Sequence, residues 1–303
     1  MSGVKGHAWE QFVLPFKSGK SLLWSPSNTG PLFVKNQVVT IHDTVPLDHP
    51  EWLNPRFANW YRFLVPRLAR RAKKIIAVSN FTKARIIETC NVPEDKISVV
   101  YNGVDQRFKP AEPEVIERAK QKTGIGSARY ILSLGSIEPR KNLARLIQAW
   151  RKIENEIPED IWLVLAGGMG AKRIFENVKL ENLPARVLVT GHVEDDLLPA
   201  LYSGALATAY VSLYEGFGLP ALEAMACGCP TMASNANAIE EVVGNAALLI
   251  NPHQLDEIAE GLLKLIRAEQ LRQGLSQKGQ QRASQFTWKQ AAEKTFEILR
   301  KQA

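Results

Sequence analysis

The sequence has no long apolar run and no recognisable leader segment. No stretch of its 303 residues approaches the ~20 consecutive apolar residues that a membrane-spanning helix requires. Its first residues, MSGVKGHAWEQF, lack the apolar run and small-residue cleavage site of a secretion signal. Apolar residues make up 45% of the chain and charged residues 23%, a composition typical of globular proteins. We therefore expect a cytoplasmic protein with two domains of ordinary size.

Cysteine is scarce, and its spacing argues against disulfides and zinc. The three cysteines, Cys90, Cys227 and Cys229, form neither an even framework nor a zinc-ligand pattern. Cys227 and Cys229 flank one glycine, so we expect small buried apolar side chains there. An acidic run at residues 194–196 is better explained as the cap of a following helix than as a metal site. The sequence therefore predicts no metal.

Positive charge is in excess, with a net charge of +7. This favours anionic partners such as nucleotide phosphates, anionic lipids or nucleic acids. No helix–turn–helix, ribonucleoprotein or zinc-finger pattern is present, so nucleic acid is not an expected partner. A helical pattern over residues 60–72 fits either a solvated helix face with its apolar side in the core, or a helix that contacts anionic lipid at the inner face of a membrane. Its aromatic and basic residues are Trp60, Tyr61, Phe63, Arg67, Arg70, Arg71, Lys73 and Lys74.

Short β-branched runs alternate with helical patterns, and a Pro-bearing segment at 108–113 divides them. The expected strands are residues 22–24, 38–41, 74–78 and 97–101 before this segment, and 130–134, 161–166, 187–189, 205–209, 231–233 and 247–250 after it. The expected helices are 60–72, 143–153, 197–202, 221–227, 239–243 and 255–266. This alternation predicts parallel sheets with crossover helices. Ligands of such sheets bind beyond the carboxyl ends of the strands.

The first of these strand ends carries two adjacent cations. Gly135 allows a tight turn, and Arg140 and Lys141 precede a helix, whose N-terminus favours anions. The segment differs from a phosphate-binding P-loop because Arg140 replaces the second glycine and Asn142 replaces Ser or Thr. A solvated basic turn is the alternative.

Two further strand ends are rich in glycine. Residues 166–170 lack the full dinucleotide fingerprint, so a close-packed turn is expected there rather than a nicotinamide site. The turn Gly191–Val193, which includes His192, would let a nucleotide base approach the backbone, although a plain turn explains it equally well.

The segment 212–228 combines glycines, a helix start and two acids. Gly216 and Gly218 leave the backbone accessible, and Pro220 suits the first position of a helix. The N–H groups of residues 217–219 would then face an anion. Glu215 and Glu223 flank this loop and are suited to accept hydrogen bonds from sugar hydroxyls. A helix cap and a buried partner are the structural alternatives for the two acids.

This segment resembles the signature of the retaining glycosyltransferases of family 4, in which two glutamates eight positions apart enclose Gly-Phe-Gly-Leu-Pro. Further matches occur in order along residues 1 to about 300. They are His-Asp at 42–43, Val-Ser-Asn-Phe-Thr-Lys at 78–83, Asn-Gly-Val-Asp at 102–105, Gly-Ser-Ile-Glu-Pro-Arg-Lys-Asn at 135–142 and Gly-His-Val at 191–193.

The resemblance implies a GT-B fold of two Rossmann-like domains that face a cleft. It implies domains at 1–112 and 113–285, and a helix at 286–303 that crosses back to the N-terminal domain. The catalytic residues it implies are His42, Arg140, Lys141 and Glu215. The donor-binding residues are Gly135, Ser136, Gly191, His192, Val193, Gly216, Phe217, Gly218, Leu219 and Glu223. Arg140 and Lys141 would neutralise a diphosphate, Glu223 would bind ribose, and Glu215 and His42 would face the hexose.

The implied activity is retaining transfer of a hexose from a nucleotide sugar, UDP-hexose ahead of GDP-mannose, without a metal or cofactor. The acceptor would be a saccharide or a lipid-linked glycan, in polysaccharide or glycolipid biosynthesis. One departure is that the expected N-terminal domain is incomplete, since an initial strand, glycine-rich loop and helix of the family have no counterpart. The alternative is therefore a nucleotide-sugar-binding subunit or inactive remnant that needs a protein partner or a second copy.

Overall fold

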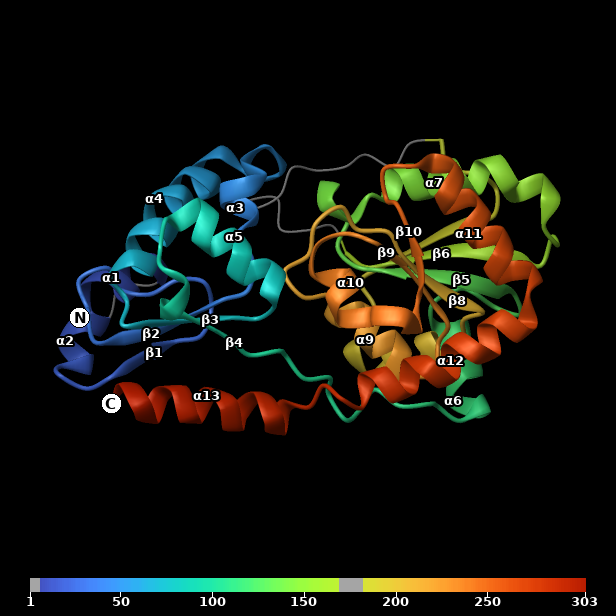
Figure 1. Cartoon of the computed structure of the whole chain (residues 1–303). Helices are drawn as coiled ribbons and strands as arrows, with labels where there is room; N and C mark the ends of the chain where they lie inside the picture. The colour runs from blue at the N-terminus through green and yellow to red at the C-terminus, as the bar shows by residue number, and fades with distance from the viewer. Residues whose placement is uncertain (1–5, 169–181) are drawn as a thin grey trace. The chain divides into compact units, whose positions relative to one another are not determined.

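The computed structural model describes residues 6–168 and 182–303, which form two compact units (Figure 1). The first unit contains the residues up to Gly103 together with Trp288–Ala303, and the second is Val104–Thr287. Val104 is the first residue of the second unit, and its N–H donates to the Phe286 carbonyl at 3.0 Å. Residues 169 and 170 of the glycine-rich strand end lie outside the described ranges.

The first unit is a four-stranded parallel sheet with strand order β1-β2-β3-β4. Its elements are α1 (Gly6–Phe12), α2 (Leu14–Ser18), β1 (Leu23–Ser25), β2 (Gln37–Ile41), α3 (Val45–Asp48), α4 (Pro55–Arg71), β3 (Lys74–Ala77), α5 (Asn80–Cys90), β4 (Ile97–Val99) and α13 (Trp288–Gln302). Side-chain caps fix two helix starts: Asn54 accepts from the Arg56 N–H, and Ser79 accepts from the Thr82 N–H.

Both faces of this sheet are covered, because successive side chains of a strand point to opposite sides. Val39 and Ile41 of β2 pack with α4 and α5, whereas Val38 packs with Ala291 of α13. No helix within the described residues is long and apolar enough to cross a membrane.

The second unit is a six-stranded parallel sheet with order β10-β9-β8-β5-β6-β7. Its strands are β5 (Arg129–Leu134), β6 (Ile161–Ala166), β7 (Val187–Gly191), β8 (Ala207–Tyr210), β9 (Thr231–Ser234) and β10 (Leu248–Ile250). Its helices are α6 (Pro113–Lys122), α7 (Leu143–Ile153), α8 (Leu198–Gly204), α9 (Leu219–Ala226), α10 (Asn237–Val243), α11 (Leu255–Arg267) and α12 (Glu269–Ala283). Strands β6 and β7 follow β5 toward one edge of the sheet, and β9 and β10 follow β8 toward the other edge. The strand order therefore reverses between the neighbours β5 and β8. Ligands bind at such a switch point in doubly wound sheets.

Helices cover the two faces of this sheet as two separate hydrophobic layers. Ile131 of β5 packs with α7 and α11, whereas Leu132 faces α6, α8 and α9. In Figure 1, α7 and α11 accordingly lie on the opposite side of the strands from α6 and α9. The short apolar runs of the sequence are therefore strands buried on both faces, as expected for a parallel sheet.

Three glycines at the carboxyl ends of β5, β6 and β7 bring the backbones together. The Gly135 N–H donates to the Ala166 carbonyl at 2.9 Å, and the Gly167 N–H donates to the Gly191 carbonyl at 2.8 Å. Gly167 has a φ of +142°, and a Cβ atom there would lie 2.0 Å from the Gly135 carbonyl oxygen. Only glycine fits this position without moving the loop that follows β5.

Gly167→Ala is expected to destabilise the second unit by roughly 3 kcal/mol, the upper part of the usual range for single substitutions, because backbone would have to move. Gly274→Ala is the matched control, since an added Cβ there meets nothing within 4 Å. Alanine in this helical position should stabilise by up to ~1 kcal/mol. Thermal unfolding of both variants tests this, and equal unfolding temperatures would contradict the close approach.

Candidate functional site

Two loops meet at the switch point of the second sheet. The loop after β5 contains residues 135–142, and the loop after β8 contains residues 211–218. The Leu213 N–H donates to the Arg140 carbonyl at 2.7 Å, and Asn142 Nδ2 donates to the Val211 carbonyl at 3.1 Å. These bonds join two loops that are about 70 residues apart in the sequence. The loops are neighbours because the strand order reverses between β5 and β8.

A buried cluster of four charges joins the two loops. Lys141 Nζ donates to Glu215 Oε1 and Arg140 Nη1 donates to Glu215 Oε2, each at 2.6 Å. On its other side Arg140 Nη2 lies 2.8 Å from Glu138 Oε1. Lys141 is only 8% exposed and Glu138 1%. The alternative of a solvated basic turn is therefore wrong, because Lys141 is buried. Buried charges of this kind are stable only when they are paired, as they are here.

The loop geometry differs from the expected helix start. Arg140 and Lys141 lie in a 3₁₀ turn, Pro139–Lys141, and Asn142 follows with a left-handed φ of +59° before α7 begins. The two cations are thus presented by the turn rather than by the first turn of the α-helix. Asn142 can adopt this conformation because asparagine tolerates positive φ better than most residues.

Glu215 is ionised at neutral pH. Burial alone raises the pKa of its carboxyl, but the charges of Lys141 and Arg140, with hydrogen bonds from Lys141 and Tyr210, outweigh burial and lower the pKa from 4.5 to about 2. By contrast, burial raises the pKa of Glu138, although Arg140 and Lys141 oppose the shift. Glu215 is therefore the negative charge that pairs with both cations of the loop.

Glu223 makes a different contact. It lies on α9, and its Oε2 accepts a hydrogen bond of 3.3 Å from the hydroxyl of Tyr202, which is buried. Burial raises the pKa of Glu223, while the Tyr202 bond and the charge of Arg107 lower it. The arrangement leaves the carboxylate suited to accept hydrogen bonds from vicinal hydroxyls.

The glycine-bearing loop leads into α9. Gly218 precedes this helix with a φ of +102°, and Leu219 is its first residue. Pro220 is therefore the second helical residue, one position later than the sequence predicts. Gly216 and Phe217 are buried, and the Phe217 ring packs edge-on against Phe286 with centroids 5.9 Å apart. A ligand at this loop would meet the backbone of Phe217 rather than its ring.

The remaining predicted residues of this unit lie at adjacent strand ends. Gly135 and Ser136 follow β5. Gly191 ends β7 with a φ of +72°, His192 is exposed, and Val193 is buried in the layer that faces α6 and α8. Val193 therefore has a packing role, and only its backbone remains available to a base.

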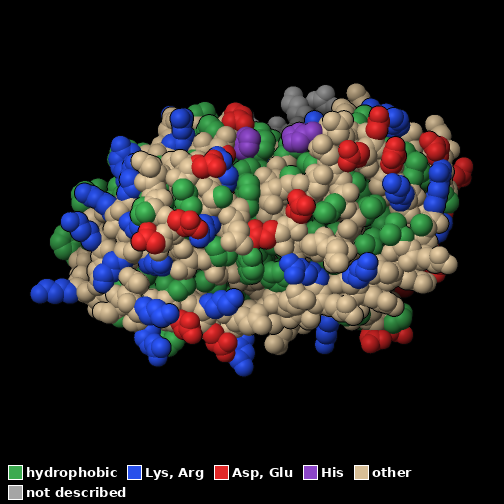
Figure 2. Space-filling view, in the orientation of Figure 1, with side chains coloured by type: hydrophobic (Ala, Val, Ile, Leu, Met, Phe, Trp, Pro, Cys, Tyr) green, Lys and Arg blue, Asp and Glu red, His purple; other side chains and the backbone are tan. Residues whose placement is uncertain are grey.

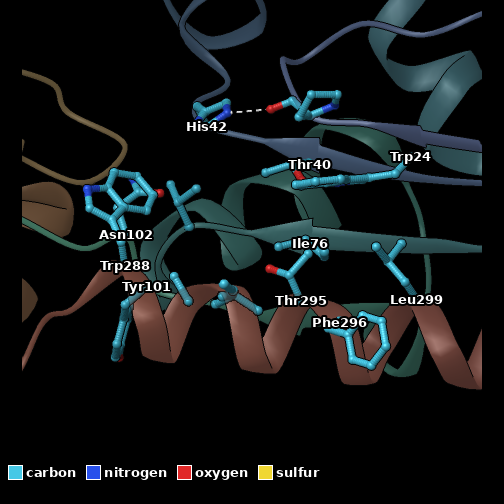
Figure 3. Close-up of a pocket in the computed structure, with 15 residues that line it drawn as sticks. Trp24, Thr40, His42, Ile76, Tyr101, Asn102, Trp288, Thr295, Phe296 and Leu299 are labelled. Atoms are coloured by element: carbon cyan, nitrogen blue, oxygen red, sulfur yellow. Dashed lines mark hydrogen bonds between the residues drawn. The ribbon is translucent and has the colours of Figure 1, made fainter.

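His42 lies in the first unit, at the end of β2 (Figure 3). Its Nε2 is 2.7 Å from the Pro26 carbonyl, and its N–H donates to Asn28 Oδ1 at 2.6 Å. It borders a cavity of about 490 Å³ between the sheet and α13, whose walls are mainly apolar and include Trp24 and Phe296. The expected role of His42 at the sugar remains a prediction.

Four residues of the site were not predicted from the sequence. Glu138 and Asn142 lie within the matched segment 135–142. Two buried cations need a nearby acid, and their turn needs an anchor, so both residues could have been predicted. Tyr202 and Tyr210 come from α8 and β8, and only the fold brings them to Glu223 and Lys141.

The cysteines have no catalytic character. All three are buried, and burial raises the pKa of Cys227 and of Cys229 to about 12. Their thiols therefore stay protonated and inert at neutral pH. Within residues 6–168 and 182–303, no group of three or more His, Cys, Asp or Glu side chains is placed to hold a metal ion.

Comparison with known proteins identifies the class. The family described as Glycosyl transferases group 1 matches residues 115–282, and Glycosyltransferase Family 4 matches residues 22–108. The chain belongs to the group 1 glycosyl transferases and is a glycosyltransferase.

Curated relatives include mannosyltransferases. The chain is 31% identical to O-antigen chain mannosyltransferase B of Escherichia coli, over 87% of this chain and 70% of that protein. It is 29% identical to the serotype-specific mannosyltransferase WbdA of Escherichia coli, over 94% of this chain but only 36% of that protein. The chain thus spans about a third of WbdA.

Solved structures give the fold. Anabaena HepE in complex with UDP-glucose superposes with a TM-score of 0.72 at 24% identity, over 88% of this chain and 72% of that chain. WaaG, a glycosyltransferase involved in lipopolysaccharide biosynthesis, gives 0.70 at 16% identity, over 94% and 80%. The fold is accordingly GT-B, with two Rossmann-like units.

Proposed function

We propose that the chain transfers a hexose from a nucleotide sugar whose diphosphate is bound by Arg140 and Lys141. The observation that carries this proposal is the buried ion cluster of Arg140, Lys141 and Glu215 at the switch point of the second sheet. Arginine binds phosphate oxygens through two parallel N–H bonds, while lysine supplies a compact charge. Glu223, five residues after Gly218, is proposed to accept the ribose hydroxyls.

The proposed chemistry is transfer with retention of configuration: the anomeric bond to the diphosphate breaks, and the acceptor hydroxyl oxygen forms the new bond on the same face of the sugar. The hydroxyl proton goes to a phosphate oxygen of the leaving diphosphate. Bond breaking places positive character on the sugar and negative charge on the leaving diphosphate. Cations already fixed in place stabilise that charge without solvent reorganisation. No metal is required in this scheme, because Arg140 and Lys141 supply the positive charge. Glu215 positions these cations and contacts the hexose, and His42 is proposed to face the sugar from the first unit.

A mannosyl donor is the specific proposal for the sugar. The family resemblance of the sequence favours UDP-hexose over GDP-mannose, but the names of the curated relatives favour mannose. We therefore place GDP-mannose first and UDP-hexose second. The O-antigen relative supports a glycan acceptor in polysaccharide biosynthesis, with a lipid-linked glycan included in this class.

The donor is tested with a thermal-shift panel of UDP, GDP, ADP and their sugars. A ligand at one hundred times its dissociation constant adds ~2.7 kcal/mol of apparent stability, so the correct nucleotide should raise the unfolding temperature measurably. Glu223→Gln should reduce the shift, since the amide accepts fewer hydrogen bonds from ribose. A transfer assay with the selected donor follows. Binding without any turnover would favour the alternative, a donor-binding subunit that requires a partner, and no shift with any nucleotide would refute the proposal.

A further inference from the structure

Large apolar side chains are exposed in one region of the first unit. Phe12 of α1 is 67% exposed, Phe33 in the loop before β2 is 73%, and Phe63 of α4 is 45%. Phe16 of α2, the helix that follows α1, is 88% exposed. Exposed rings of this size are uncommon on a soluble surface unless the surface binds something.

Three of these rings line a single groove of about 510 Å³. Its walls come from α1, the loop before β2 and α4, and they are almost entirely apolar. They are His7, Ala8, Gln11, Phe12, Leu32, Phe33, Trp60 and Phe63. We call this surface the phenylalanine groove. Leu64, Val65 and Leu68 of α4 point into the core, so Phe63 is not needed to bury the apolar side of that helix.

Arginines border the phenylalanine groove. The Arg67 guanidinium lies over the Phe63 ring at 4.0 Å, and Arg71 lies 5.8 Å from the Phe33 ring while donating to the Leu32 carbonyl. Helix α4 carries five arginines and no acidic residue, and no acid occurs between Glu51 and Glu88. Figure 2 shows many Lys and Arg side chains over the left part of the surface, where Figure 1 places α1, α2 and α4.

Apolar rings beside arginines match a bilayer with anionic headgroups. The rings can enter the boundary between headgroups and acyl chains, while the arginine stems follow them and the guanidinium groups stay at the phosphates. A second copy of the chain fits less well, because its own groove is bordered by the same positive charges. A nucleic acid duplex also fits less well, because its charged backbone would cover an apolar surface.

We propose that the first unit docks on an anionic lipid surface through the phenylalanine groove, with Phe12, Phe33 and Phe63 inserted and Arg67 and Arg71 at the headgroup phosphates. This site belongs to the first unit and is separate from the ion cluster of the second. The proposed lipid contact determines where the enzyme is located. It can be tested without knowing the donor proposed above.

Cosedimentation of the full chain with vesicles tests this inference. Binding should be strong to phosphatidylcholine vesicles that contain phosphatidylglycerol, weak to pure phosphatidylcholine, and reduced by salt. Arg67→Gln with Arg71→Gln should weaken partitioning about 30-fold, at about fivefold for each charge at the surface. Phe12→Ser with Phe33→Ser should weaken it about tenfold for each ring removed.

Matched controls separate the groove from general charge and apolarity. Arg118→Gln with Lys278→Gln removes the same net charge from exposed positions of the second unit, and Phe296→Ser removes a ring that is 66% exposed on α13. Both should leave binding unchanged, and thermal unfolding checks that every variant folds. Equal loss in controls and groove variants, or equal binding to both vesicle types, would overturn the proposal. A dimer in gel filtration that the Phe12 and Phe33 substitutions dissociate would instead assign the groove to a second copy.

Discussion

Lys141→Met is expected to lower kcat/KM by about 10²–10³-fold, the usual effect of removing one preorganised group that stabilises developing negative charge. Methionine keeps much of the side-chain volume but supplies no charge to the leaving diphosphate. Lys141 Nζ is held by Glu215 and lies 3.4 Å from the Tyr210 hydroxyl, so its position is fixed before a donor arrives. Steady-state transfer kinetics measure the effect.

The control for this variant is Lys152→Met. Lys152 is an exposed lysine of α7 that pairs with Asp256 at the surface, and such pairs contribute little. Calorimetry with the nucleoside diphosphate should show weaker binding for Lys141→Met and unchanged binding for Lys152→Met. Wild-type turnover in Lys141→Met would exclude the lysine from the diphosphate site.

Glu215→Gln is expected to separate binding from turnover. In the wild type Glu215 holds both Arg140 and Lys141, so an incoming diphosphate competes with this carboxylate for the cations. Removing the negative charge should retain or tighten nucleoside diphosphate binding while turnover falls about 10²–10³-fold, because the cations lose their fixed geometry. Parallel calorimetry and transfer assays test this, and an equal loss of both would assign Glu215 to simple binding.

The same variant should change the pH dependence of stability. A carboxyl whose pKa is lowered from 4.5 to about 2 stabilises the fold above pH 4.5, and this contribution disappears as the pH falls toward 2. The shift corresponds to about 3 kcal/mol. Glu215→Gln should therefore be less stable at pH 7 and lose less stability on acidification. Glu240→Gln, at an exposed position of α10, is the control and should follow the wild type.

The sequence predicts the second unit well because its signals are local. The spacing of apolar residues at 143, 146, 147 and 150 predicts a helix over 143–153, and α7 has these bounds. The apolar run 161–166 is β6. The loops that carry Arg140 and Glu215 can be predicted from the apolar runs before them and the glycines at the strand ends. Each of these patterns can be recognised within a few consecutive residues.

The remaining features depend on long-range contacts or on weak local patterns. The ion pairs of Glu215 join loops about 75 residues apart, and no spacing rule indicates which acid faces which cation. Helix α12 has few apolar residues and two glycines, so its periodicity is faint. The phenylalanine groove joins residues from α1 to α4, and only the fold brings Phe12 beside Phe63.

The pairing of Glu138 and Glu215 with Arg140 and Lys141 has a consequence for how a donor is found. The negative charge of Glu215, held between the two cations, weakens the field that they project, so this field falls off faster than that of a lone cation pair. Under the proposed function, a diffusing nucleotide would gain little attraction from this cluster until it reaches the loop. At the loop, the cations would exchange carboxylate oxygens for the phosphate oxygens of the proposed donor, so the cluster would select its ligand by direct contact.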